Sequence, residues 1–251
     1  MVEVLEATRK KFTEILREEG LEKKTIDIAV RGLEVEEAIG DPERDDFPLQ
    51  QGEEVMIEAT FGDSRGQAFT DRPTDYSGSI SELLELNLNR PHNRALVVAA
   101  VNAVLRELDL IEGTRHCRDE EPGKCGQRMV EWLDENHPEV NKLGIVGYQP
   151  AIIEACYKSY GKNLMVSDLN PERVGEQVGE GVRVLNGKTE NRQLVEETDF
   201  VLATGSTIIN GTINELLQLF EEYNRSHAFF GNSIAGPAYL LNLPRLCFYG
   251  H

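Results

Sequence analysis

Three short apolar runs in this sequence are each followed directly by glycine or polar residues that could bind a ligand. The runs cover residues 143–146, 164–166 and 200–203, and each is typical of a buried strand. In open parallel sheets, ligands bind beyond the carboxyl ends of the strands. The sequence therefore predicts one small-molecule crevice, unless these residues only form turns and helix caps. Its candidate ligand-binding residues are Gly147, Tyr148, Asp168, Thr204, Gly205, Ser206, Thr207 and Asn210.

Asp168 has the spacing of a residue that binds a nucleotide. It lies about 20 residues after Gly147, as does the acidic residue that holds a ribose hydroxyl in Rossmann-type sites. However, Tyr148, Gln149 and Pro150 follow Gly147, so the G-x-G-x-x-G fingerprint of dinucleotide sites is absent. We therefore expect a nucleotide-type crevice that does not bind NAD or NADP. S-adenosylmethionine stays an open option, because Asp168 could hold its ribose equally well.

The segment 204–212 is rich in glycine and hydroxyl residues. Such a loop lets backbone N–H groups approach an anion or a polar ligand at a helix N-terminus. Thr212 and Glu215 match a capping box, which predicts that a helix begins there. Residues 231–237 follow another apolar run and predict a further loop on the same rim.

Two residues earlier in the chain are candidates for the opposite side of the crevice. Asp71 follows a predicted strand at residues 67–70, where it either caps a turn or reaches toward the crevice. Asn102 is the one polar residue in the apolar run 95–105. Because buried amides need hydrogen-bond partners, Asn102 either bonds a loop or faces the ligand.

His116, Cys117 and Cys125 are candidate metal ligands in the polar segment 112–126. Imidazole and thiolate groups can bind a divalent transition metal. Their spacing matches no known zinc module, so a polar loop without metal is the alternative. Cys117 is also a candidate nucleophile, with His116 beside it.

The composition narrows the classes of partner. The formal net charge of −18 disfavours nucleic acid and anionic membrane surfaces. No run approaches the ~18 apolar residues of a membrane span. The four cysteines form no C-x-x-C pair, which is typical of reduced thiols in a cytoplasmic protein. We expect a small-molecule ligand as partner, and we leave open whether the protein forms a homo-oligomer.

Two groups of elements position these residues. Residues 1–89 predict a small α+β domain: a helix ending near Gly20, a strand at 25–31, a hairpin of 54–60 with 67–70, and a helix from a capping box at 79–82. Residues 90–251 predict an α/β domain with a mostly parallel sheet. It begins with a buried helix at 95–105, a polar loop at 112–126 and a helix at 127–136. A helix at 151–160, with Pro150 at its first position, follows the first strand. Further strands are predicted at 182–185, 228–230 and 246–248.

The order of these motifs resembles a known family. The motifs lie at residues 66–71, 102–103, 147–150, 168–171, 203–207 and 210–212. Together they are similar to the family described as putative heavy-metal chelation proteins. The resemblance implies an enolase-N-terminal-like domain followed by a Rossmann-like domain related to methyltransferases, with the active site between them. It also implies a role in chelation, or in condensation or hydrolysis during the synthesis of flavin-, pterin- or siderophore-like compounds.

The sequence thus predicts a crevice that binds a small polar metabolite, either metal-chelating or nucleotide-like, in cofactor or chelator metabolism. In that interpretation Asp168 holds a hydroxyl, while Asp71 and Asn102 close the site from the other side. The alternative from another class is a non-enzymatic heavy-metal binding or delivery protein that uses His116, Cys117 and Cys125. Whether the protein is an enzyme stays open at this point.

Overall fold

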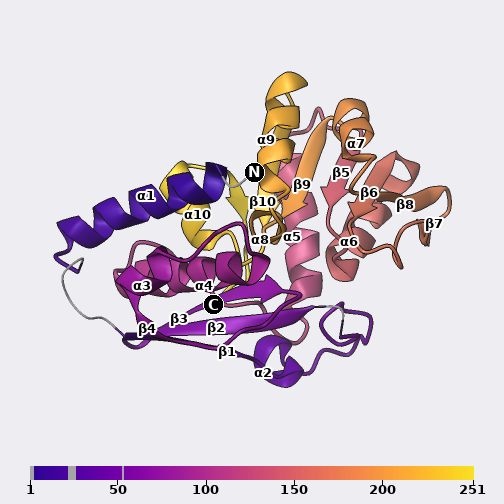
Figure 1. Ribbon diagram of the computed structural model, residues 1–251. Helices are drawn as coiled ribbons and strands as arrows, with labels where there is room; N and C mark the ends of the chain where they lie inside the picture. Colours follow the sequence, from indigo (N-terminus) through magenta and orange to yellow (C-terminus); the bar gives the residue numbers. More distant parts are fainter. Residues whose placement is uncertain (1–2, 22–26, 53) are drawn as a thin grey trace.

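The computed structural model describes residues 3–21, 27–52 and 54–251, and it contains two β-sheets with helices packed around them (Figure 1). One sheet has four antiparallel strands and the other has seven mostly parallel strands. The fold class is therefore mixed α/β, as predicted. Among the described residues, no helix is both long and apolar enough to span a membrane.

The four-stranded sheet has the order β3-β2-β1-β4. The predicted hairpin is present and turns tightly at Gly62 and Asp63, so that Phe61 pairs with Ser64. The predicted strand at 25–31 is found from Asp27 onward, while residues 25 and 26 lie outside the described part. The strands are β1 (Asp27–Gly32), β2 (Val55–Phe61), β3 (Ser64–Thr70) and β4 (Tyr76–Ser79), and the short helices beside them are α2 (Val35–Ile39) and α3 (Ile80–Leu84).

The seven-stranded sheet has the order β11-β10-β9-β5-β6-β8-β7, and only β7 is antiparallel to its neighbour. Without β7, the six parallel strands have the order 3-2-1-4-5-6 of a Rossmann-type doubly wound sheet. The strands are β5 (Leu143–Val146), β6 (Leu164–Asp168), β7 (Gln177–Gly179), β8 (Val182–Asn186), β9 (Phe200–Thr204), β10 (Ser226–Phe230) and β11 (Arg245–Leu246).

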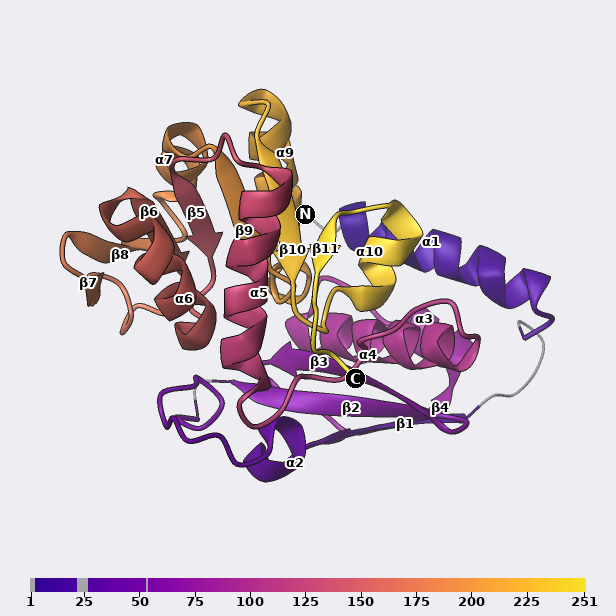
Figure 2. The same cartoon turned by 180° about the vertical axis from the view of Figure 1, so that it is seen from behind.

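Helices cover both faces of this sheet (Figures 1 and 2). On one face, α5 (Glu121–Asn136) and α6 (Pro150–Tyr160) pack on Ile145, Val166 and Leu202. On the other face, α7 (Asn191–Glu197), α9 (Ile213–Glu222) and α10 (Ala235–Leu241) pack on Val146, Val201 and Phe229. Side chains that alternate along each strand therefore enter two separate cores, as expected for a sheet that is buried on both faces.

Helix α4 (Pro91–Glu107) lies between the two sheets. It packs on β2 and β3 on one side and on α8 (Thr207–Asn210) and α10 on the other. The run Ala95 to Leu105 is buried throughout, which explains why the helix is apolar all round. Helix α1 (Glu3–Glu18) packs on α9 and α10, so a segment from the start of the chain covers the second sheet's helices. The predicted domain boundary between residues 89 and 90 stays a prediction.

Three local expectations differ from the structure. The last predicted strand, 246–248, is found as β11 at Arg245–Leu246. Helix α5 begins at Glu121 rather than at residue 127, because Pro122 occupies its first turn, where a missing N–H costs nothing. Cys125 is therefore on a helix and not in a loop. The Thr212 capping box does not form, since the Thr212 hydroxyl donates to Asn210 Oδ1 instead of accepting from the helix.

The two capping-box sequences give a matched stability test. At α3 the predicted box is present, because Ser79 Oγ accepts the Glu82 N–H at 3.2 Å and the Glu82 carboxylate accepts the Ser79 N–H at 3.1 Å. We expect Ser79→Ala to lower the free energy of unfolding by about 1 kcal/mol. Thr212→Ala should lower it by less than about 0.5 kcal/mol, as is usual for surface changes. Urea unfolding measures both, and equal losses would contradict the assignment.

Candidate functional site

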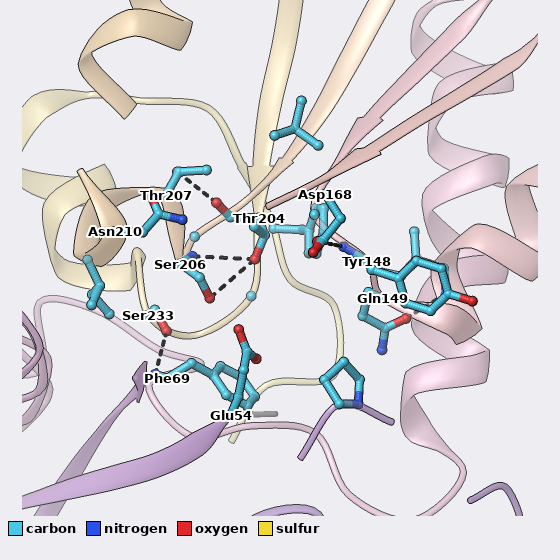
Figure 3. Close-up of a pocket in the computed structure, with 18 of the residues that line it drawn as sticks. Glu54, Phe69, Tyr148, Gln149, Asp168, Thr204, Ser206, Thr207, Asn210 and Ser233 are labelled. Atoms are coloured by element: carbon cyan, nitrogen blue, oxygen red, sulfur yellow. Dashed lines mark hydrogen bonds between the residues drawn. The ribbon is translucent and has the colours of Figure 1, made fainter. Parts of the chain in front are cut away.

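A cavity of about 400 Å³ lies where the carboxyl ends of β5, β6, β9 and β10 meet the edge of the first sheet (Figure 3). This volume is within the usual range for small-molecule sites. Nine of the ten predicted ligand-binding residues line it: Asp71, Gly147, Tyr148, Asp168, Thr204, Gly205, Ser206, Thr207 and Asn210. The three candidate metal ligands, His116, Cys117 and Cys125, also line it. That any of them binds a ligand stays a prediction.

The cavity sits at the topological switch point of the parallel sheet. Strands β5 and β9 are neighbours, and the chain leaves β5 toward β6 but leaves β9 toward β10, on the opposite side. The loops after these two strands therefore diverge and leave a crevice between them. The three strand ends chosen from the sequence meet here because parallel strands share one carboxyl edge.

Gly147 allows the loops after β5 and β9 to approach each other closely at the base of this crevice. Its φ is +103°, in a region that residues with a side chain rarely adopt. A Cβ at this position would lie 2.4 Å from Thr204 Cγ2, so the two loops touch across the switch point. The next residues lead into α6, where the Gln149 side chain caps the helix by accepting the Ile152 N–H at 2.7 Å.

Asp168 ties two loops of the site together. Its Oδ2 accepts the Tyr148 N–H and its Oδ1 accepts the Asn170 N–H, both at 2.7 Å. Hydrogen bonds from backbone N–H groups to a carboxylate are among the stronger ones in proteins. Asp168 therefore positions the loops after β5 and β6, and its bond to a ligand hydroxyl stays a prediction.

The loop after β9 is held by its own hydroxyl groups. Thr207 Oγ1 donates to the Thr204 carbonyl oxygen at 2.8 Å, and the Ser206 N–H donates to Thr204 Oγ1 at 3.3 Å (Figure 3). The helix that follows, α8, has only four residues. Its aligned peptide dipoles are too few for a strong anion site, so the hydroxyl and amide groups of Ser206 and Asn210 are the better ligand contacts here.

Asn102 bonds a loop, which was one of the two alternatives, and it is absent from the cavity lining. Its Nδ2 donates to the carbonyl oxygens of Gln67 at 3.0 Å and Asn232 at 3.1 Å. Its Oδ1 accepts the Gly236 N–H at 2.7 Å. The side chain is fully buried with every polar group bonded, so it braces the site from behind.

His116, Cys117 and Cys125 lie on the wall that faces the first sheet. His116 Nδ1 donates to the Cys117 carbonyl oxygen at 2.5 Å, which leaves Nε2 as an acceptor. Burial lowers the pKa of His116 to about 4 and raises the pKa of the Cys117 thiol far above its usual value. Burial also raises the pKa of Cys125 to about 11. At neutral pH both thiols are protonated, which makes Cys117 a poor nucleophile.

The structure does not assemble a metal centre from these side chains. Within the described ranges, no group of three or more His, Cys, Asp or Glu side chains is arranged to hold a metal ion. The metal role of His116, Cys117 and Cys125 therefore stays a prediction, and so does the delivery function built on it.

The charged side chains of the lining are all acidic. Glu54, Asp71 and Asp168 contribute carboxylates, and none of the described lining residues is a lysine or an arginine. Figure 3 shows the Glu54 carboxylate on the opposite side of the cavity from Thr204 and Ser206. The lining also contains four aromatic side chains, from Phe47, Phe69, Tyr148 and Phe230.

Sequence reasoning did not identify several of these residues. Glu54 and Phe69 lie within predicted strands, whose side-chain directions depend on how the two sheets meet. Asn232 and Ser233 belong to the rim loop 231–237 but were not singled out. Ser233 Oγ accepts the Phe69 N–H at 3.1 Å, which joins that loop to the edge strand of the first sheet (Figure 3).

A protein-family model matches part of this chain. The model of the DUF364 family, described as "Putative heavy-metal chelation", matches residues 131–233. This match confirms the resemblance to that family, and it covers the loops after β5, β6 and β9 that line the cavity.

Two solved structures of DUF364 proteins of unknown function are similar to this chain. The protein from Pyrococcus horikoshii is 16% identical, covers 92% of this chain and 79% of its own, and has a TM-score of 0.47. The protein from Desulfitobacterium hafniense DCB-2 is 19% identical, covers 74% of this chain and 72% of its own, and has a TM-score of 0.43. No curated protein matches the chain significantly.

The contact between Gly147 and Thr204 predicts a large effect of one methyl group. Gly147→Ala combines an unfavourable φ with a clash against Thr204, and it should lower the free energy of unfolding by more than about 2 kcal/mol. Gly123→Ala in α5 is the control, because nothing lies within 4 Å of the added methyl group. The control should be neutral or stabilising by up to ~1 kcal/mol. Equal stability of the two variants in urea unfolding would contradict this account.

The lowered pKa of His116 predicts a loss of stability in mild acid. Between about pH 6.5 and pH 4 the unfolded chain binds a proton on this imidazole and the folded chain does not. Stability should therefore fall as the pH decreases through this window, by at most roughly 3 kcal/mol.

Comparing variants isolates this contribution. His116→Gln should remove that part of the pH dependence, whereas His92→Gln should keep it. Unfolding curves recorded at several pH values measure the difference, and identical pH profiles for wild type and His116→Gln would refute the assignment.

Proposed function

We propose that the cavity binds a small metabolite that is neutral or positively charged, carries an unsaturated ring and is rich in hydrogen-bond donors. The observation that carries this proposal is the lining: three carboxylates and four aromatic rings, without a lysine or arginine among its described members. Such a surface favours flat molecules with N–H or O–H groups over phosphorylated ones.

Charge is the strongest discriminator among the candidate cofactors. At an effective dielectric constant of ~20, two like charges ~4 Å apart repel by about 4 kcal/mol. The two phosphates of NAD would approach the carboxylates of Glu54, Asp71 or Asp168, and the described lining contains no lysine or arginine to bind these phosphates. This supports the expectation that NAD and NADP bind poorly. S-adenosylmethionine carries a sulfonium cation and no phosphate, so it stays compatible with the site.

The family description supports a metabolite of cofactor or chelator metabolism. A molecule that chelates a metal would bring the ion into the cavity with it, whereas the protonated Cys117 and Cys125 thiols would first have to lose protons. Within this class, an enzyme of condensation or hydrolysis is the function we favour. In this proposal, the carboxylates of Glu54 and Asp71 would accept a proton from a bound substrate.

A ligand screen with charge variants tests this proposal. We expect S-adenosylmethionine, unphosphorylated pterins or unphosphorylated flavins to raise the melting temperature, and a ligand at 100 times its Kd should add about 2.7 kcal/mol. NAD and NADP should not. For a cationic ligand, the double variant Glu54→Gln, Asp71→Asn should weaken binding by about tenfold or more.

Two controls separate charge from folding in this screen. Asp75→Asn alters an exposed carboxylate outside the cavity lining and should leave binding unchanged. A neutral ligand of the same shape should bind the double variant as well as it binds wild type. The proposal fails if NAD stabilises the protein as strongly as the unphosphorylated compounds do.

A further inference from the structure

Asn232 has a buried acceptor without a protein partner. The residue follows β10, lines the cavity and is 1% exposed. Its Oδ1 is shielded from solvent, and within the described part of the chain it has no hydrogen-bond partner. Buried polar atoms are nearly always paired, so an unpaired acceptor on a residue that lines a cavity is a candidate contact for a ligand donor.

The orientation of the Asn232 amide is set by a chain of hydrogen bonds that begins at Glu58. Gln67 Nε2 donates to Glu58 Oε2 at 2.8 Å. Since a carboxylate is an acceptor, the nitrogen of Gln67 must face Glu58 and its oxygen must face the other way. Gln67 Oε1 then accepts the His116 N–H at 2.7 Å and Asn232 Nδ2 at 3.4 Å.

This series of hydrogen bonds fixes Oδ1 of Asn232 as an acceptor. Turning the amide over would place Asn232 Oδ1 against Gln67 Oε1, two acceptors with no proton between them. The backbone of Asn232 is held as well, because its carbonyl oxygen accepts Asn102 Nδ2. Arg65 and Arg115 each approach the Glu58 carboxylate to 3.7 Å, which stabilises the negative charge on Glu58.

We infer that Asn232 Oδ1 binds an N–H or O–H group of the ligand and selects for a donor at that edge of the molecule. This inference rests on the proposed function and narrows it to rings that carry a ring N–H or an amino group. His116 belongs to the same wall, since its backbone shares Gln67 Oε1 with Asn232, and its Nε2 is a second acceptor. A ring that offers only acceptors would leave Asn232 Oδ1 buried and unpaired, which costs affinity.

Two small probes of the same shape test the inference. The donor probe is 2-aminobenzimidazole, and the probe without donors is 1,2-dimethylbenzimidazole, both at a pH where they are uncharged. Calorimetry or ligand-observed NMR measures their binding to wild type, Asn232→Ala, Glu58→Gln and Thr114→Val. Thr114 is buried and bonds the Arg65 carbonyl oxygen, so its variant disturbs the same region without touching the cavity.

We expect Asn232→Ala to lose affinity for the donor probe and to keep its affinity for the probe without donors. Wild type should bind the donor probe at least about tenfold more tightly than the other probe, and Asn232→Ala should remove that preference. Glu58→Gln should reduce the preference with Asn232 still present, because Gln67 is then free to turn over. Thr114→Val should keep it.

Two outcomes overturn the inference in different ways. If both probes bind wild type in the cavity and Asn232→Ala weakens them equally, Asn232 contributes shape and not a hydrogen bond, and the proposed function survives. If neither probe binds wild type at millimolar concentration, the inference and the proposed function both fail. Competition with a ligand from the screen shows whether a probe occupies this cavity.

Discussion

The amide of Asn102 is the interaction on which the arrangement of the two sheets depends. It lies on α4 with no exposure to solvent, and its three hydrogen bonds reach β3, the loop after β10 and the start of α10. Breaking any one of them would leave a buried polar group unpaired. The contact also requires close packing, because a Cβ on Gly66 would lie 2.2 Å from the Ala103 nitrogen. The edge of the first sheet is therefore held at one distance from the carboxyl ends of the second.

This fixed distance determines what the cavity can bind. The second sheet supplies loops whose polar groups largely satisfy one another, such as Asp168 with Tyr148 and Thr204 with Thr207. The first sheet and the segment before α5 supply Glu54, Phe69, Asp71 and His116, which add two carboxylates, an imidazole and an aromatic ring to the lining. The parallel sheet thus provides the crevice that its topology dictates together with Asp168, whereas the segments at the ends of β2 and β3 add the carboxylates of Glu54 and Asp71. The proposed selectivity for a donor-bearing, unphosphorylated molecule depends on residues from both sheets.

The features predicted correctly from the sequence are those that follow from local rules. Strand ends, the Gln149 cap and the Ser79 capping box depend on residues a few positions apart, so their types and spacing are informative. The Thr212 box has the same sequence pattern, yet its hydroxyl has a competing partner in Asn210, and the pattern alone cannot show this. Asn102 could be recognised as buried, but the choice between a loop and a ligand depended on residues 35 and 130 positions away. The roles of Glu54 and Asn232 depend on the meeting of two sheets, for which the sequence has no short-range signal.

The same long-range packing determines the charge of the side chains that a metal ion would meet in this site. Cys117, Cys125 and His116 are close to one another because the segment before α5 crosses the edge of the first sheet, and that crossing also buries them. Burial keeps the two thiols protonated and the imidazole neutral, so none of these groups carries a charge that would attract a cation. The carboxylates of Glu54, Asp71 and Asp168 do carry that charge, but they come from three different elements and form no metal-binding group among the described residues. The cavity therefore contains carboxylates, but its described residues do not offer an ion a complete set of ligands. A cation that arrives already held by an organic molecule fits both conditions, since the molecule supplies the missing ligands and the cavity supplies the carboxylates.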